Sequence, residues 1–355
     1  MNEAGPSRRA RLGVALLTGL AMGAVSALVS ALSAPSWASD FDPVHAGARA
    51  LLAGRDPYAL SAAERRNPFG LFYPVPALLA ALPVAWLPLA AARAAFAGLT
   101  SALYAFAVTR DGWTRWPALV SMALVQNAIL CQWSALLVGA MLTPALAGLL
   151  LTKPNIGAAL GLAGVTDPAA LGGRRHLPTA ALSVFAVVLV AFTIRPDWIG
   201  AWLGALRDTR HVTAPIARGS GLGLLLLLAA LRWRRPEARL LLTLSLVPAT
   251  PSAVEGLPLF LVCRTPREAA WFAVLTYVEY IAVGAAWAAG WSAPSGPGVT
   301  YVSAGAVMSL ALLYLPCLVM VLRRPNEAPE GRDEKLRRPV ARNGGRQGNV
   351  LARGE

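Results

Sequence analysis

The sequence predicts an all-α polytopic membrane protein, and three observations lead to this prediction. Apolar residues make up 56% of the 355 residues and charged residues only 14%, whereas a soluble protein carries about a quarter charged residues. Several apolar runs reach the roughly 20 residues that a helix needs to cross a bilayer. These runs do not alternate apolar and polar residues, as the strands of a membrane β-barrel do over about ten residues.

The first expected element is a membrane span over residues 12–34. Three of the four residues 8–11 are arginines, and cytoplasmic flanks of spans are rich in Lys and Arg. Residues 1–11 are therefore expected to form a cytoplasmic N-terminal tail. The apolar run is longer than the roughly 7–15-residue core of a signal peptide, which favours an uncleaved span. Residues 35–72 then form a first outer loop.

The transmembrane domain is expected to extend over residues 12–322, with about ten to twelve transmembrane or re-entrant helices. Segments 73–91 and 239–263 each contain several prolines. Broken helices at membrane depth persist only where they are buried in protein or line a wet cavity, so we expect both segments to line a cavity. The apolar segments after the first span are 73–91, 94–109, 116–131, 133–152, 154–170, 177–195, 219–232, 239–263, 269–290 and 300–322.

The distribution of arginines predicts that both termini are cytoplasmic. If residues 239–263 formed one simple span, this topology would place the C-terminal tail outside. A re-entrant hairpin that turns near Pro248–Gly256 returns the chain to the inner face, so that the tail is cytoplasmic. It also holds Glu255 near the outer mouth. The clusters expected inside are those at 8–11, 174–175, 232–235 and 323–324.

Composition also bears on the tail and on possible partners. Residues 323–355 contain almost no large apolar groups, which predicts a disordered basic cytoplasmic tail near anionic lipid. The net charge is +14. Because no nucleic-acid-binding motif accompanies it, we interpret the basic residues as setting the membrane topology and anchoring the chain to lipid. No cofactor motif or metal-ligand spacing is present. The three cysteines are far apart and are expected to be small buried hydrophobes: Cys131, Cys263 and Cys317.

Two carboxylates stand close together where the chain leaves the first span, in Ser39-Asp40-Phe41-Asp42. An ionised carboxylate at the outer surface suits a general base that accepts a proton from a sugar hydroxyl. An interfacial Asp also caps helices, and position alone leaves both roles open for Asp40. Asp42 is the better cap because Pro43 fits the first helical position, which leaves Asp40 for chemistry. The Asp-x-Asp spacing suits a divalent ion, but nucleotide sugars are absent from the outer face, so no metal is expected.

Four other polar residues are candidates for substrate binding. His45 and Arg49 lie four apart and share a helix face, where they can gather a phosphate or a sugar; a solvated amphipathic face is the alternative. Gln132 lies between two apolar runs and can bond sugar hydroxyls or hold helices together. Lys153 adjoins an apolar run and can contact a lipid phosphate or snorkel from a span end.

Three further features allow simpler interpretations. Glu279 lies within an apolar segment, and an intramembrane carboxylate is a functional candidate by default; a bond to a neighbouring hydroxyl is the alternative. Residues Arg195–Trp198 are expected to close a span and begin an interfacial helix to Leu206, with the Trp as a surface anchor. Asp56 and Pro57 stand in the usual places of a turn.

Four stretches in the N-terminal part of the chain form an ordered set of motifs. They are Asp40-Phe41 with a helix over 48–54 and the turn Asp56-Pro57-Tyr58; Phe72-Tyr73-Pro74-Val75-Pro76; Cys131-Gln132-Trp133-Ser134; and Lys153-Pro154. Together they resemble the polyprenol-phosphate-mannose-dependent mannosyltransferases of glycosyltransferase family 87, which are C-type membrane glycosyltransferases. In the third stretch, Cys131 stands where that family usually has glycine.

The resemblance implies a C-type glycosyltransferase fold with Asp40 as the base on the non-cytoplasmic face. It also implies an inverting transfer of a sugar, mannose in that family, from a polyprenyl-phosphate donor to a lipid- or glycan-linked acceptor, without a nucleotide-sugar site. A lipid-linked glycan transporter or flippase, with the same cavity but no base, is the alternative function. The side chains expected to bind donor or acceptor are Asp42, His45, Arg49, Tyr73, Gln132, Lys153 and Glu255.

Overall fold

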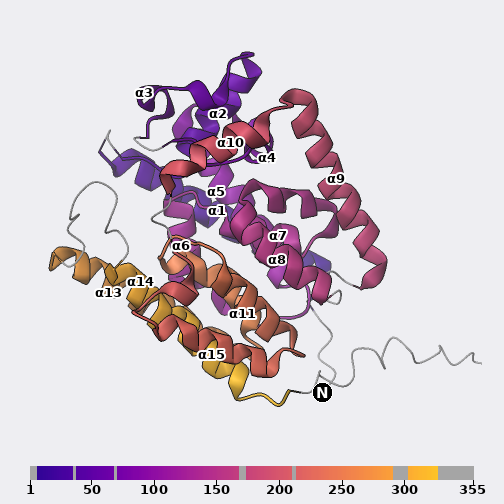
Figure 1. Cartoon of the computed structure of the whole chain (residues 1–355), viewed down its shortest axis with the longest axis vertical. Helices are drawn as coiled ribbons and strands as arrows, with labels where there is room; N and C mark the ends of the chain where they lie inside the picture. The colour runs from indigo at the N-terminus through magenta and orange to yellow at the C-terminus, as the bar shows by residue number, and fades with distance from the viewer. Residues whose placement is uncertain are drawn as a thin grey trace, which may run out of the picture.

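The computed structural model is built from helices (Figure 1) and contains no strand within the described residues. The predicted tail over 323–355 lies outside these residues beyond Asn326. The structure describes residues 6–34, 37–67, 70–167, 173–209, 213–290 and 303–326.

The helices follow the apolar segments of the sequence closely. The longer ones are α1 (Arg8–Leu32), α2 (Asp42–Leu52), α5 (Leu89–Val108), α8 (Pro154–Thr166), α9 (Leu177–Ile194), α11 (Pro236–Leu246) and α13 (Pro266–Ala288). The shorter ones are α3 (Ala62–Arg65), α4 (Val75–Ala81), α6 (Met122–Ile129), α7 (Ser134–Met141), α10 (Trp198–Ala205), α12 (Gly256–Leu259), α14 (Ser303–Ser309) and α15 (Leu315–Leu322).

Within the described part of the chain, five helices are long and apolar enough to cross a membrane, or six if the bent pair α6–α7 is one span. This architecture fits the polytopic membrane protein predicted from the sequence. Other expected segments fold as shorter pieces, because prolines interrupt them or because they wind as 3₁₀ helices, over Pro144–Thr152 and Leu222–Arg232. Many side chains of α9 are exposed and apolar, among them Leu182 and Phe185, as expected of a helix facing lipid.

Helices α1 and α5 pack closely because small residues line their contact. A Cβ atom added at Gly19 would lie 2.9 Å from the carbonyl oxygen of Gly98, and one added at Gly23 would lie 3.1 Å from that of Ala94. Small residues allow membrane helices to approach at backbone distance. The Arg11 guanidinium donates to the carbonyl of Phe106 at 2.7 Å, so the two helices run antiparallel.

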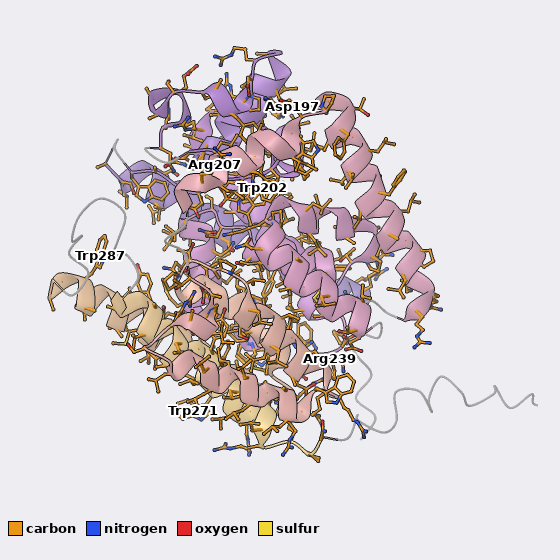
Figure 2. All side chains as sticks on the ribbon, in the orientation of Figure 1. Asp197, Trp202, Arg207, Arg239, Trp271 and Trp287 are labelled. Atoms are coloured by element: carbon orange, nitrogen blue, oxygen red, sulfur yellow. The ribbon has the colours of Figure 1, made fainter. Side chains whose placement is uncertain are left out.

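The molecule has two opposite ends, which α5 connects. Its 20 residues span about 30 Å, close to the thickness of the hydrocarbon core. Asp40 lies near the start of α5, and we call this the Asp40 end. The other end, the Glu237 end, holds arginines from three of the clusters predicted to be cytoplasmic, namely Arg11, Arg232, Arg235 and Arg324. In Figure 2, Asp197 and Trp202 lie toward the first end and Arg239 lies at the second.

The chain over 236–264 forms a hairpin, which is the shape that the predicted re-entrant segment requires. Helix α11 starts at the Glu237 end, and the chain turns within residues 247–252 before returning through α12. The guanidinium of Arg264, at the end of the return, pairs with Glu237 near the start of α11 at 2.8 Å. The turn lies beside the start of α8, where Asn155 donates to the carbonyl of Pro248.

Three local predictions can be compared with the fold. Asp56 accepts the Tyr58 N–H at 2.8 Å, which confirms the turn, and α10 is the expected helix after Arg195–Trp198. The surface anchor is wrong: Trp198 is buried against Phe192 and Trp202, because α9 and α10 fold onto each other. The three cysteines are all buried and free, as predicted.

Candidate active site

The tip between α6 and α7 organises the site. The two helices bend by 115° at this break, and residues 130–133 turn the chain. Cys131 adopts a φ of 49°, a left-handed conformation that glycine adopts readily and other residues rarely do. This is the position at which the resembling family usually has glycine. The turn directs Gln132, which is only 5% exposed, into the protein.

Asp40 makes two hydrogen bonds to this tip. Its backbone N–H donates to the carbonyl of Leu130 at 3.2 Å, and its half-buried carboxylate accepts a hydrogen bond from the Gln132 amide Nε2. Tyr73 lies close enough to the same carboxylate to influence its pKa. The loop after α1 and the tip between α6 and α7 are thereby joined through one acidic side chain.

Lys153 completes a chain of three side chains. It lies directly before α8, and its Nζ donates to Gln132 Oε1 at 3.1 Å. An ammonium group only donates and a carboxylate only accepts, so the Gln132 amide has one orientation that satisfies both neighbours. The fold brings Asp40, Gln132 and Lys153 from three distant segments of the sequence into one polar chain.

Aromatic side chains form a wall beside this polar chain. Tyr73 and Trp133 are buried, with ring centroids 5.4 Å apart, and Phe96 packs edge-on against Trp133 at 4.9 Å. The indole Nε1–H of Trp133 is buried and has no hydrogen-bond partner within the described residues. Apolar and aromatic walls with a few converging polar groups are typical of small-molecule sites.

Burial raises the pKa of Asp40 above its ordinary value of 3.8, and the nearby Asp42 charge acts in the same direction. The Lys153 ammonium, the hydrogen bond from Gln132 and the nearby Tyr73 hydroxyl oppose this shift only in part. A carboxylate with a raised pKa is a stronger base than a solvated one. This direction suits proton abstraction, for which the best pKa lies near the working pH.

Asp42 has a structural role that differs from the helix cap predicted from the sequence. Its carboxylate accepts from Ser39 N–H at 2.9 Å, from the Ser39 hydroxyl at 2.6 Å and from Arg93 Nε at 2.7 Å. The predicted N-cap is wrong, because α2 starts at Asp42 itself and Phe41 precedes it without a side-chain cap. All its oxygens are engaged, and the pair with Arg93 is buried. Asp42 is therefore not available to a substrate.

His45 and Arg49 share a helix face, as predicted, but neither is a partner of Asp40. Both line a separate cavity beside α2. The imidazole Nε2 of His45 donates to the carbonyl of Leu87 at 3.1 Å, and Arg49 is exposed. The expectation that they gather one ligand together with Asp40 is not met.

Glu255 is also occupied. It is 4% exposed, and both of its oxygens accept from Arg218, at 2.9 and 2.8 Å. Its negative charge acts on Lys153, so it supports the site from the hairpin turn rather than binding a ligand directly. Glu279 is buried, and its Oε1 has no hydrogen-bond partner within the described residues, so this oxygen does not make the bond to a hydroxyl that was the alternative interpretation.

Sequence reasoning missed Arg93 and Arg218, which neutralise the two occupied carboxylates. Arg93 lies inside the apolar helix α5, where a cation is costly unless it is paired; that signal was available and pointed to a buried acid. Arg218 directly precedes the predicted apolar segment 219–232, where an arginine is an ordinary flanking residue, so its position did not indicate a buried partner.

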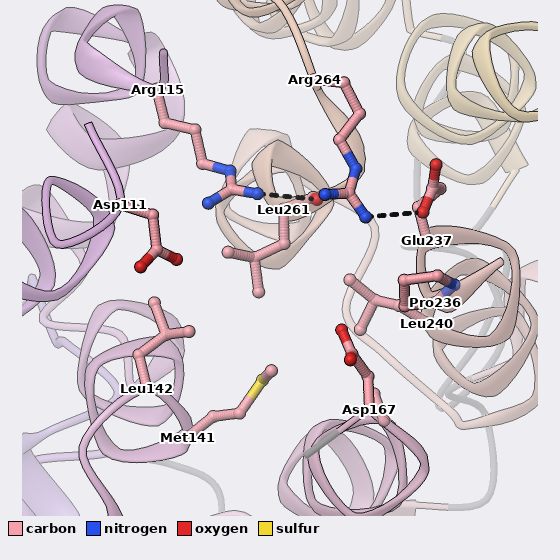
Figure 3. Close-up of a pocket in the computed structure, with 11 residues that line it drawn as sticks. Asp111, Arg115, Met141, Leu142, Asp167, Pro236, Glu237, Leu240, Leu261 and Arg264 are labelled. Atoms are coloured by element: carbon pink, nitrogen blue, oxygen red, sulfur yellow. Dashed lines mark hydrogen bonds and ion pairs between the residues drawn. The ribbon is translucent and has the colours of Figure 1, made fainter. Parts of the chain in front are cut away.

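A second pocket lies at the Glu237 end (Figure 3). Arg115 and Arg264 extend their guanidinium groups along one side of it, with Asp111 and Asp167 opposite. Arg264 pairs with Glu237, and Arg115 donates to the carbonyl of Leu261 at 3.4 Å. Its volume is about 50 Å³, which is small beside the roughly 300 Å³ or more of ligand sites.

No family model, curated protein or solved structure matches this chain. Within the described residues, no group of three or more His, Cys, Asp and Glu side chains is arranged to hold a metal ion. In particular, Asp40 and Asp42 bond to different partners and do not form a joint carboxylate pair.

Proposed function

We propose that this chain is an integral membrane glycosyltransferase that moves a sugar, with mannose the first candidate, from a polyprenyl-phosphate donor to a lipid- or glycan-linked acceptor. The observation that carries the proposal is the polar chain Asp40–Gln132–Lys153. It joins the residues of three of the four motifs that resemble family 87, and Tyr73 of the remaining motif lies close enough to the same carboxylate to influence its pKa. The left-handed Cys131 also agrees with that family's glycine.

The proposed fold is of the C-type, and the Asp40 end faces away from the cytoplasm. The arginine clusters at the Glu237 end support this orientation, because Lys and Arg accumulate on the cytoplasmic side of membrane proteins. A polyprenyl chain would then lie in the outer part of the bilayer, with its phosphate at the level of Asp40. Both termini would be cytoplasmic.

The proposed reaction is a single inverting displacement. Asp40 accepts the proton of the acceptor hydroxyl as that oxygen forms a bond to the anomeric carbon, and the bond from this carbon to the phosphate oxygen breaks. The electron pair leaves with the polyprenyl phosphate, and Lys153 compensates its charge. A phosphate is a good leaving group, so the chemistry needs a base more than an acid.

The test is transfer of radiolabelled mannose from polyprenyl phosphate to a membrane lipid extract by the purified chain in detergent. Asp40→Asn is expected to lower the rate by about 10²–10⁴-fold, with unchanged expression and elution from size-exclusion chromatography. Asp197→Asn is the matched control, because Asp197 is an exposed carboxylate at the same end and its loss is expected to leave the rate unchanged. Near-normal transfer by Asp40→Asn would reject the base.

The same assay separates an enzyme from a transporter. A flippase gives no labelled product with the wild-type chain, but it moves the intact lipid-linked sugar across vesicles. That result would overturn the transferase proposal while leaving the site geometry in place.

A further inference from the structure

A cavity beside α2 is independent of the Asp40 site. It has a volume of about 540 Å³, within the range of roughly 300–1,000 Å³ of small-molecule sites. The residues Asp42, His45 and Arg49 line it from one face of α2, and the first residues of α5 line the opposite side. Asp40 is not among its lining residues. We call this cavity the arginine pocket, after Arg49, Arg55, Arg65 and Arg66 in its wall.

The arginine pocket has an excess of positive charge. Its two lining carboxylates are already neutralised: Asp42 pairs with the buried Arg93, and Glu64 pairs with Arg55 at 2.8 Å. Within the described residues, Arg49 and Arg66 make no ion pair. An anion in the pocket would meet these cations without a competing free carboxylate.

The backbone presents one of these arginines in an unusual way. Arg66 ends α3 with a φ of 52°, a left-handed conformation that is uncommon for a residue other than glycine. The Ser61–Glu64 capping box at the start of α3 fixes this short helix. Arg55, which follows α2, pairs with Glu64 of α3 at 2.8 Å, and this pair joins α3 to the end of α2.

The surroundings of the arginine pocket fit the membrane surface. Trp86 is 75% exposed and lies just before the residues of α5 that line the pocket, and Leu52 is 65% exposed one turn after Arg49. Exposed Trp is enriched at the level of lipid head groups. His45 is buried, and burial lowers its pKa, so at neutral pH it adds hydrogen-bonding capacity but no charge.

We propose that the arginine pocket is a second binding site, which takes the phosphate-bearing head group of an anionic lipid at the membrane surface. The guanidinium groups of Arg49 and Arg66 contact the phosphate oxygens, a geometry for which arginine is well suited. The site does not depend on the glycosyl transfer proposed above, because its residues are separate from Asp40, Gln132 and Lys153.

The test measures lipid retained by the purified chain in nanodiscs of phosphatidylcholine with a graded share of spin-labelled phosphatidylglycerol. The expected result is selective retention of phosphatidylglycerol, reduced about fivefold by Arg49→Gln and by Arg66→Gln. Gln keeps the length and the helix propensity of the side chain. The matched control is Arg207→Gln, which removes an exposed arginine at the same end but outside the pocket, and its retention is expected to equal that of the wild type.

A competition arm identifies the source of the phosphate. If inorganic pyrophosphate does not displace the spin-labelled lipid, the site takes a lipid head group; if it does so in an Arg49-dependent manner, the pocket also accepts free phosphate anions, and both results support an anion site. Equal retention by wild type, Arg49→Gln and Arg66→Gln overturns the proposal, as does an equal loss with Arg207→Gln. None of these outcomes bears on transfer by Asp40, which is assayed separately.

Discussion

The carboxylates at the two ends of the molecule differ in how many cations they contact. At the Glu237 end, Glu237 accepts from three arginines, Arg235, Arg264 and Arg324, at 2.9, 2.8 and 3.0 Å. At the other end, Asp40 has no direct cation partner within the described residues and meets Lys153 only through the Gln132 amide.

The two environments have opposite electrostatic results. Burial tends to raise the pKa of Glu237, but hydrogen bonds and charge from the arginines outweigh it and lower the pKa to about 2. The pKa of Asp40 is raised instead, because burial outweighs the effect of the Lys153 ammonium, which contacts Asp40 only through Gln132. A carboxylate saturated with arginines stabilises the fold, whereas one with fewer partners is left reactive.

The largest expected effect is on stability, and it concerns Glu237, the acid that is paired with arginines. Glu237→Gln leaves three arginines without their shared charge, and removing one partner of a buried ion pair costs about 3–5 kcal/mol. Thermal unfolding in detergent should therefore start at a clearly lower temperature. Glu64→Gln is the control, because its pair with Arg55 is exposed and is worth about 1 kcal/mol or less.

Asp40→Asn should move the melting temperature the other way. A raised pKa means that the folded state disfavours the charged carboxylate, so its destabilising effect grows as pH rises through the folded-state pKa. At neutral pH the neutral amide is expected to raise the melting temperature while transfer is lost. A lower melting temperature for Asp40→Asn would place this acid among the structural ones.

The next effect in size concerns Lys153. Lys153→Met removes the cation proposed to compensate the leaving phosphate, and loss of one such electrostatic contact costs about 10²-fold in rate. Lys153→Arg keeps the charge and should retain part of the activity. If Lys153→Met transfers sugar at the wild-type rate, the lysine is only a support for Gln132.

The pH dependence sharpens the same comparison. A general base works only when deprotonated, so transfer should fall as pH is lowered through a pKa above the ordinary 3.8 of Asp. Lys153 lowers the pKa of Asp40, and Lys153→Met should therefore move this acid limb to higher pH. The measurement is kcat/KM against pH for both chains; coincident acid limbs would show that Lys153 does not act on Asp40.

The sequence predicted part of the site. Asp40, Gln132 and Lys153 meet in the fold, whereas the other predicted residues Asp42, His45, Arg49 and Glu255 do not join them. Asp40, Gln132 and Lys153 were named because polar groups are scarce in this apolar chain and each needs a partner. Which partner each one finds depends on how distant helices meet, as the pairs Asp42–Arg93 and Glu255–Arg218 illustrate. For the same reason, the hairpin at 236–264 followed from charge parity, whereas the short and bent helices did not follow from hydropathy.

The smallest expected effect tests the geometry that holds Gln132 in place. Cys131 sits at a φ of 49°, which disfavours most residues by about 1–2 kcal/mol. Cys131→Gly relieves this strain but loses the contact of Sγ with the Ser26 hydroxyl at 3.4 Å, so stability and transfer should stay close to wild type. Cys131→Val adds a β-branch where the backbone tolerates it least.

The Val variant should lower both the melting temperature and the rate, the latter less than Lys153→Met does, because a shifted tip displaces Gln132 from Asp40 and Lys153. Cys317→Val, at a buried cysteine in α15 with ordinary helical backbone, controls for the change in side-chain shape. Equal behaviour of the Gly and Val variants at position 131 would show that the tip relaxes freely. The position of Gln132 would then have to be fixed by its hydrogen bonds to Asp40 and Lys153 alone.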